Sequence, residues 1–315
     1  MEKTNQKKEE QTHRLLIVSP EGSLGAQLSC IAAALDYGVQ TRRQVFFVPA
    51  LNMLQKTYYW STLFVGLPQI LDPNAFAPIV NLPANWHLKA ARSLLKNIHC
   101  FDLKEIKEKK ILDVKEACVL WEKTQIPMEY IDHHKSRLLE LKEGFWAQCF
   151  PDSYWAHALQ IAQQSDWEVF KNKNARVVHL PLSFLSDSKL DHTKILSEAM
   201  TTEKNNKPIL GISQLKGMEK AKELLQVIGG QNGKVTLLET WKWPDFINLL
   251  LLGILFWYSG GGIVHSKSKF ARWAMYAAEY LQQYSSKLIQ PPQATTTTRP
   301  TTKPQVEKLN WVFFC

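Results

Sequence analysis

The stretch that most constrains the fold is 14–50, where apolar runs alternate with a glycine-bearing turn. Leu15 to Val18 is a short apolar run that predicts a buried strand, and Val45 to Val48 predicts a second one. Between them, a turn at 22–27 leads into an alanine-rich segment at 28–37, which favours a helix packed closely on a sheet. The order strand, turn, helix, strand predicts a βαβ unit of an open α/β sheet.

The turn of this unit contains Gly22 and Gly25. In open α/β sheets, anionic ligands bind where a strand end meets a helix start, because free backbone N–H groups and the helix dipole both face that point. Glycine pairs also form plain tight turns. Two interpretations therefore stay open for the residues alone: a phosphate or nucleotide site, and a simple turn.

The same stretch resembles the opening of the α-1,2-fucosyltransferases, whose pattern is G-x-x-G-N-Q, an alanine-rich helix and a short strand ending in Phe-x-Pro-Ala. Gly22, Gly25 and Gln27 match this pattern, as does the segment 48–50. Ala26 departs from it, because the family has Asn there. The resemblance implies that the turn contacts a nucleotide-sugar donor, with one polar contact missing at Ala26.

The second half repeats the strand and helix rhythm. Apolar runs at 176–182, 208–213, 235–238 and 262–265 predict strands, with helical patterns between them. The apolar segment Asp245 to Phe256 predicts one of these helices and matches the family's Asp-x-x-Leu-Leu segment. This rhythm predicts a second doubly wound domain.

The strand at 176–182 carries the largest departure from the family. In the fucosyltransferases, the corresponding strand ends in His-x-Arg-Arg-Gly-Asp, and an arginine grips the donor pyrophosphate through parallel N–H bonds. His179 matches, but Pro181 and Leu182 replace the arginines, and Phe184 replaces the aspartate. Each lost charge-assisted bond contributes roughly 1.5 to 3 kcal/mol, so we expect donor binding to weaken at least about tenfold per bond.

The segment Ser266 to Leu281 resembles the family's closing motif of Ser or Thr, Phe, two spacers and Trp-Ala-x-Tyr-Leu. Ser268, Phe270 and Trp273 agree with it. The alternative interpretation is an ordinary capped helix with aromatic core residues. The resemblance implies donor-binding roles for the following residues: Gly22, Gly25, Gln27, His179, Ser268, Phe270 and Trp273.

Two lysines flank Ser268. Lys267 and Lys269 lie where a strand end meets a helix start, and their charges suit a phosphate. We hypothesise that they replace part of the charge lost at Pro181 and Leu182.

Four regions follow from these patterns. We expect a polar disordered N-terminus at 1–12, a Rossmann-like domain at 13–170, a nucleotide-sugar-binding Rossmann-like domain at 171–289, and a Pro/Thr-rich tail at 290–315. The two domains are expected to face a cleft, as in the GT-B fold that the resemblance implies. The last apolar residues of the tail fit a docking strand.

Composition narrows the partners. The 315-residue chain has a formal charge of +9, from 38 Lys and Arg residues against 29 Asp and Glu residues, which favours an anionic partner. Nucleic acid is disfavoured, because the basic residues alternate with acidic ones, as at 104–110, and no nucleic-acid-binding motif accompanies them. The five cysteines show no Cys-x-x-Cys spacing, and His133-His134 has no third ligand at zinc spacing, so we expect no metal.

Two segments bear on membrane association. The N-terminus lacks the apolar core of a signal peptide, so the family's Golgi membrane anchor is expected to be missing from this chain. The segment Phe246 to Val264 is nearly long enough to span a bilayer. Its three consecutive glycines and Ser259 favour a buried helix, a turn and a buried strand instead.

Taken over 15–281, the resemblance implies an inverting transfer of fucose from GDP-fucose to a terminal galactoside, without a metal, in the Golgi. The catalytic residues stay unknown, because the expected carboxylate is absent at the matching position. The alternative function is a non-catalytic relative that binds a glycan or a protein, and the altered arginines and Ala26 favour it. A membrane protein anchored through 246–264 is the third alternative.

Overall fold

The computed structural model describes only part of the chain in detail. The described residues are 15–18, 20, 22–47, 59, 62–64, 66–67, 118–121, 126, 128–133, 142–164, 175–201, 209–213, 218–229, 235–239, 243–288 and 309–315. Predictions made for 1–12 and 290–308 lie outside them. The chain divides into two compact units, Met1–Cys149 and Phe150–Cys315, and both contain a parallel sheet with helices, as the α/β prediction requires. The cleft expected between the domains stays a prediction.

The first unit contains a three-stranded sheet in the order β2-β1-β3, in which both neighbours of β1 run parallel to it. The helix α1 connects β1 to β2 and packs on both strands, which confirms the predicted βαβ unit. Glycine allows this close packing, since a Cβ on Gly38 would lie 2.3 Å from a methyl group of Val45. The elements are β1 (Leu15–Val18), α1 (Leu24–Thr41), β2 (Gln44–Phe47), β3 (Cys118–Trp121), α6 (Met128–His133) and α8 (Lys142–Cys149).

The second unit contains a five-stranded sheet in the order β6-β5-β4-β7-β8, with every pair parallel. Counted from β4 in chain order, the strands lie in the order 3-2-1-4-5, and the order reverses between β4 and β7. In doubly wound sheets, ligands bind outside the carboxyl ends of the strands at such a reversal. The strands are β4 (Arg176–Leu180), β5 (Ile209–Ser213), β6 (Val235–Glu239), β7 (Gly261–His265) and β8 (Asn310–Phe314).

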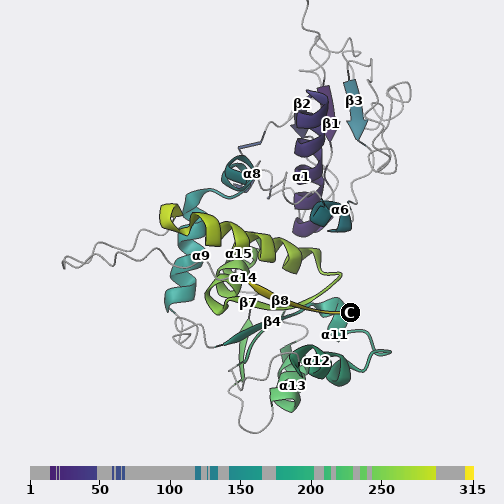
Figure 1. Ribbon diagram of the computed structural model, residues 1–315, viewed down its shortest axis with the longest axis vertical. Coiled ribbons are helices and arrows are strands. Elements are labelled where there is room, and N and C mark those ends of the chain that lie inside the picture. The colour runs from purple at the N-terminus through teal and green to yellow at the C-terminus, as the bar shows by residue number, and fades with distance from the viewer. Residues whose placement is uncertain are drawn as a thin grey trace, which may run out of the picture. The chain divides into compact units, whose positions relative to one another are not determined.

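Helices cover both faces of this sheet (Figure 1). α14 packs on β4, β7, α15 and α9, while α12 and α13 pack on β8, β5 and β6. α14 is buried along most of its length because nearly every side chain from Phe246 to Phe256 is apolar. The helices are α9 (Asp152–Gln164), α11 (Leu182–Leu185), α12 (His192–Thr201), α13 (Met218–Gly229), α14 (Asp245–Ser259) and α15 (Lys269–Leu288).

The predicted helix, turn and strand at 246–264 are confirmed as α14, a turn at Gly260 and β7. Gly260 has φ +74° and Gly261 has φ +136°, so two left-handed glycines reverse the chain between the elements. Among the described residues, no helix combines the length and the apolar character needed to cross a membrane.

The boundary between the units differs from the predicted boundary after residue 170. The second unit begins at Phe150 and therefore includes α9. The reason is the apolar side of α9: Trp155 contacts Tyr280 with ring centroids 5.7 Å apart, and Tyr154 contacts Phe246 at 4.9 Å. The polar run after α9 resembles a hinge in sequence, but the packing of the helix decides its unit.

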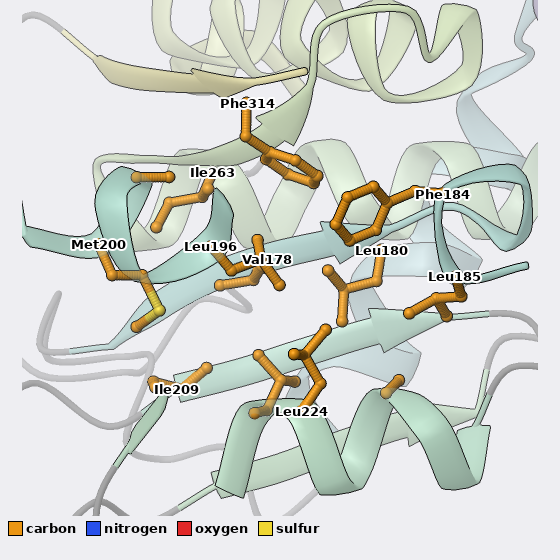
Figure 2. Packing of buried hydrophobic residues seen from close by; sticks show 13 residues of the cluster. Val178, Leu180, Phe184, Leu185, Leu196, Met200, Ile209, Leu224, Ile263 and Phe314 are labelled. Carbon is orange, nitrogen blue, oxygen red and sulfur yellow. The ribbon is translucent and has the colours of Figure 1, made fainter. Parts of the chain in front are cut away.

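The prediction of a tail over the whole of 290–315 is wrong at its end, where β8 pairs with β7 in register from Gly261↔Asn310 to His265↔Phe314. The docking strand expected for the last apolar residues is thereby confirmed. Phe314 is 4% exposed and belongs to the core of the second unit (Figure 2). β8 is held in the sheet because Val312 and Phe314, two residues apart, pack on the core and bury apolar surface. The preceding Pro/Thr-rich sequence has no such apolar side chains to bury.

Gly261→Ala is expected to detach β8 from the sheet. An added Cβ would lie 1.8 Å from the carbonyl oxygen of Asn310, in a backbone conformation that only glycine adopts readily. Gly260→Ala is the matched control, because its φ is also left-handed but no atom lies within 4 Å of the added Cβ. We expect Gly260→Ala to lower the free energy of unfolding by about 1 to 2 kcal/mol in urea titrations, and Gly261→Ala to lower it by clearly more. Equal losses would contradict this account of the turn.

Candidate functional site

The first candidate region is the turn that precedes α1. Gly22 has φ +95°, and an added Cβ there would lie 3.2 Å from the Cβ of Ala26, so the turn needs glycine at this position. Gln27 is 2% exposed, and its Nε2 donates a hydrogen bond of 3.0 Å to the carbonyl oxygen of Gly22. Gly25 is buried in the first turn of α1, where its carbonyl oxygen accepts a bond from the hydroxyl of Ser29.

These contacts show what three of the predicted donor-binding residues do in the structure of the turn. Gly22, Gly25 and Gln27 shape the turn, and Gln27 fixes it from the buried side. Ser23 precedes the helix without a side-chain cap, and no acidic residue lies in the first turn of α1. The first turn of α1 therefore places no negative side chain against the positive end of the helix dipole, which suits an anion.

The second candidate region lies at the carboxyl ends of β4 and β7, on either side of the strand reversal. His179, near the end of β4, is 8% exposed, and its buried Nδ1 has no hydrogen-bond partner among the described residues. Its ring stacks on Phe270 in the first turn of α15, with centroids 5.9 Å apart. Burial, followed by the nearby charge of His265, lowers the pKa of His179 to about 4. The fold thus brings together two of the residues for which the resemblance implies donor-binding roles.

His265, the last residue of β7, was not singled out from the sequence. It is 9% exposed and contacts Phe184 and Phe314, with ring centroids 5.6 and 5.2 Å away. Burial and then the charge of Lys267 lower its pKa. The signal that would have found it is its position, because the strand after an apolar helix ends at this histidine and a Ser-Lys-Ser turn follows.

An aromatic cluster fills the space beside His265. The rings of Phe184 and Phe314 point toward one another from α11 and β8, with centroids 4.9 Å apart (Figure 2). The ring of His192 lies nearly perpendicular to that of Phe184, with centroids 4.7 Å apart, and its Nε2 lies 2.7 Å from the carbonyl oxygen of Phe184. Apolar and aromatic contacts therefore occupy one side of the strand reversal.

The segment that replaces the family's arginines forms the short helix α11. Pro181 precedes it with φ −70°, and its carbonyl oxygen accepts hydrogen bonds from the amides of Phe184 and Leu185. Phe184 is 1% exposed. The predicted strand at 176–182 therefore ends at Leu180, because Pro181 starts a helix and Phe184 enters the core.

The polar residues just downstream serve local structure. The Oδ1 of Asp187 accepts a bond from the amide of Lys189, and the Oδ1 of Asp191 accepts one from the amide of Lys194 at the start of α12. Asp191 thus has the position and bond of a helix cap. Neither aspartate replaces the carboxylate that the family has at Phe184.

The contacts of Ser268 and Trp273 fit the alternative interpretation, an ordinary capped helix with aromatic core residues. The Oγ of Ser268 accepts a hydrogen bond of 3.2 Å from the amide of Ala271, which is the bond of a helix cap. Trp273 is 3% exposed and contacts Tyr276 edge-on at 5.4 Å, so its side chain belongs to the core. Among the described residues, no group of three His, Cys, Asp or Glu side chains has the arrangement to hold a metal ion.

No protein-family model and no curated protein sequence matches this chain. Among solved structures, fucosyltransferase NodZ from Bradyrhizobium shares 13% sequence identity over 84% of this chain and 91% of its own, with a TM-score of 0.49. NodZ α-1,6-fucosyltransferase soaked with GDP-fucose shares 14% identity over 83% of this chain and 91% of its own, also with a TM-score of 0.49. A variant of Arabidopsis thaliana FUT1 in complex with GDP shares 11% identity over 83% of this chain and 68% of its own, with a TM-score of 0.47. All three TM-scores stay below 0.5, so the functional reasoning rests on the residues of this chain.

Ser268→Ala is expected to lower the free energy of unfolding by about 1 kcal/mol, because the amide of Ala271 loses its cap. Ser23→Ala is the matched control, since Ser23 precedes α1 without a capping bond, and we expect a change within about 0.5 kcal/mol. Urea unfolding followed by circular dichroism measures both. A loss for Ser23→Ala as large as that for Ser268→Ala would refute the assignment.

The stability of the second unit is expected to fall in acid because of His179. Its pKa is about 4 in the folded chain and 6.5 in the ordinary case, so the unfolded chain binds the proton first. Stability is then complete above about pH 6.5, declines as the pH falls toward 4, and loses about 3 kcal/mol over that window. His179→Gln removes this part of the slope in urea unfolding at a series of pH values, whereas His157→Gln, on the exposed side of α9, leaves it in place. A slope that survives His179→Gln unchanged would contradict the burial argument.

Proposed function

We propose that this chain binds GDP-fucose and transfers fucose, with inversion and without a metal, to a terminal galactoside acceptor. The observation that supports it most directly is the strand reversal of the second unit. The resemblance puts donor-binding residues on the strand now seen as β4 and at the start of α15, and the fold brings His179 and Phe270 from these two elements into ring contact there. The α-1,2 linkage and the acceptor come from the resemblance alone.

The candidate residues at the strand reversal then have tasks in donor binding. The stacked pair of His179 and Phe270 forms a wall at the strand reversal, with a buried imidazole nitrogen still available for a polar ligand atom. The N-terminus of α15, fixed by Ser268, presents the positive end of a 20-residue helix. A diphosphate leaving group carries negative charge that this end stabilises as it develops.

The transfer itself breaks the bond between the anomeric carbon of fucose and the diphosphate oxygen. A hydroxyl oxygen of the acceptor forms the new bond on the opposite face, and its proton passes to a base that the described residues do not identify. We place this reaction in the Golgi, where the family that the chain resembles works.

The second candidate function is a non-catalytic relative that binds a glycan or protein partner. One observation favours it. The segment where the family has its arginines forms the apolar helix α11, and the ring of Phe184 contacts the rings of His192 and Phe314. Such packing leaves no place there for a guanidinium to grip phosphate. The donor would then bind weakly or not at all.

Calorimetric titration with GDP-fucose, followed by a fucose transfer assay on galactoside acceptors, separates the two functions. Binding together with transfer supports the first function. Weak or absent donor binding without transfer refutes the first function and is the result that the second one predicts. We expect the double variant Lys267→Ala, Lys269→Ala to bind GDP-fucose at least about tenfold more weakly, because two cations are lost beside the helix start. Unchanged affinity would end the hypothesis that these lysines replace the missing arginines.

A further inference from the structure

The end of β8 contacts the segment that leads into α15. The amide of Ser266 donates a hydrogen bond of 2.8 Å to the carbonyl oxygen of Phe314, and the Oγ of Ser266 lies 2.9 Å from the Sγ of Cys315. In the first turn of α15, the guanidinium of Arg272 lies over the ring of Phe313, 4.6 Å from its centroid. Three consecutive residues, 313–315, therefore hold both the turn and the start of the helix.

The same start of α15 forms the ring contact at the strand reversal. Phe270 stacks on His179 with ring centroids 5.9 Å apart. On either side of Phe270, backbone hydrogen bonds fix the segment. The amide of Ser268 donates to the carbonyl oxygen of His265, and the amide of Arg272 donates to that of Ser268. A displacement of this segment would therefore move Phe270 relative to His179.

Alternate residues of β8 reach opposite faces of the sheet. In the register of the strands, Phe313 and His179 both lie opposite Val264, and Phe314 lies one position further, opposite His265. Side chains alternate between the two faces along a strand, so Phe313 shares a face with His179. Phe314 points to the other face, into the core of Figure 2. A change at Phe314 therefore reaches the ring of His179 through the turn rather than by direct contact.

β8 lies at the edge of the described sheet, with β7 as its one neighbour there. It follows α15 after the connection 289–309, although about 2 to 6 residues suffice for such a connection in α/β units. The free energy of local opening differs between parts of a structure and is lowest where few contacts hold a segment. The end of β8 is therefore a part of the sheet that can be loosened or fixed more firmly while the central strands stay paired.

We propose that the end of β8 positions the donor site. With residues 313–315 docked on the turn 266–268, the start of α15 is held so that Phe270 lies against His179, and donor affinity depends on this docking. The inference rests on the proposed function for the identity of the ligand, whereas the positioning itself can be measured without a nucleotide. Because coupling between sites is reciprocal, bound donor also holds β8 more firmly on the sheet.

Phe314→Ala in the full chain tests this dependence. The smaller side chain loosens the end of β8, so we expect GDP-fucose to bind roughly fivefold or more weakly in calorimetric titrations, as is usual for coupled sites. Trp311→Ala is the matched control, because Trp311 contacts Phe256 from the start of β8, away from the turn. Its donor affinity should stay close to the wild-type value. Wild-type affinity in Phe314→Ala, or equal losses in both variants, would overturn the proposal.

A reversible disulfide separates positioning from the loss of core packing. In Ser266→Cys, the new thiol lies beside that of Cys315, because the present side-chain atoms are 2.9 Å apart and a disulfide needs about 2.05 Å between its sulfurs. Diamide oxidises the two thiols to a disulfide and is itself reduced to the hydrazine, and dithiothreitol reverses the bond. We expect the closed disulfide to restore donor affinity in the double variant Ser266→Cys, Phe314→Ala.

The same double variant with Cys315→Ser added is the control for this oxidation, since the disulfide at the turn cannot form in it. Its affinity should stay low with diamide and with dithiothreitol. If closing the disulfide leaves the affinity as low as in the open form, the loss in Phe314→Ala came from packing alone, and the proposal fails. It also fails if the closed disulfide abolishes binding in Ser266→Cys, because β8 would then have to leave the turn for the donor to bind.

The ring protons of His179 report the positioning without a nucleotide. Stacking on Phe270 displaces their NMR resonances from those of an exposed histidine such as His157, and His179→Gln assigns them. We expect these resonances to move toward the exposed position in Phe314→Ala and to return when the disulfide closes in the double variant.

This measurement distinguishes the inference from the proposed function. If GDP-fucose binds to none of these chains while the His179 resonances respond as expected, the positioning by β8 is supported and the proposed donor is refuted. If GDP-fucose binds while the resonances ignore both Phe314→Ala and the disulfide, the positioning is overturned and the proposed donor is retained.

Discussion

The close contact between α14 and α15 is the constraint on which the second unit depends. A Cβ on Gly253 would lie 2.7 Å from the Cβ of Ala277, so the two helices approach at the distance that glycine and alanine allow. α14 is buried between the sheet, α15 and α9, and its apolar surface supplies much of the hydrophobic free energy of this unit. Because α15 is held against α14, its first turn comes to rest at the end of β4. Helix packing thus places Phe270 on His179.

The same packing explains how the chain keeps its shape while departing from the family at the end of β4. Arginines at Pro181 and Leu182 would need water or phosphate around their guanidinium groups, whereas this chain turns immediately into α11. Phe184 then meets Phe314, which β8 contributes from the far end of the sequence. The amide of Ser266 donates to the carbonyl oxygen of Phe314, so the end of β8 also fixes the turn before α15. The sequence change after β4 and the pairing of β8 therefore depend on each other, because Phe184 and Phe314 pack together.

Much of this fold can be predicted from the sequence, because short apolar runs and glycines report directly on a parallel sheet. The βαβ unit at 14–50 and the helix, turn and strand at 246–264 follow from local patterns. The boundary at Phe150 and the pairing of β8 do not, since both depend on which distant surface an amphipathic element covers. In the candidate site, motif matches pointed to His179 and Phe270, whereas no family motif marks His265, whose ring neighbours Phe184 and Phe314 come from distant parts of the chain. Local sequence does not report a neighbour on another strand.

The unpaired Nδ1 of His179 bears directly on how the strand reversal is understood. Leaving a buried polar atom without a partner costs about 1 to 3 kcal/mol, a large part of the net stability of a domain. If the site were only a packing core, a phenylalanine at position 179 would stack on Phe270 equally well and avoid that cost, as Phe184 already does on the opposite side. Nor does a buried histidine stabilise the chain in acid, because its pKa of about 4 makes folding weaker as protons are added. The unpartnered Nδ1 of His179 lies near the carboxyl end of β4, beside the strand reversal where doubly wound sheets bind ligands, and this coincidence is what motivates the proposed donor site.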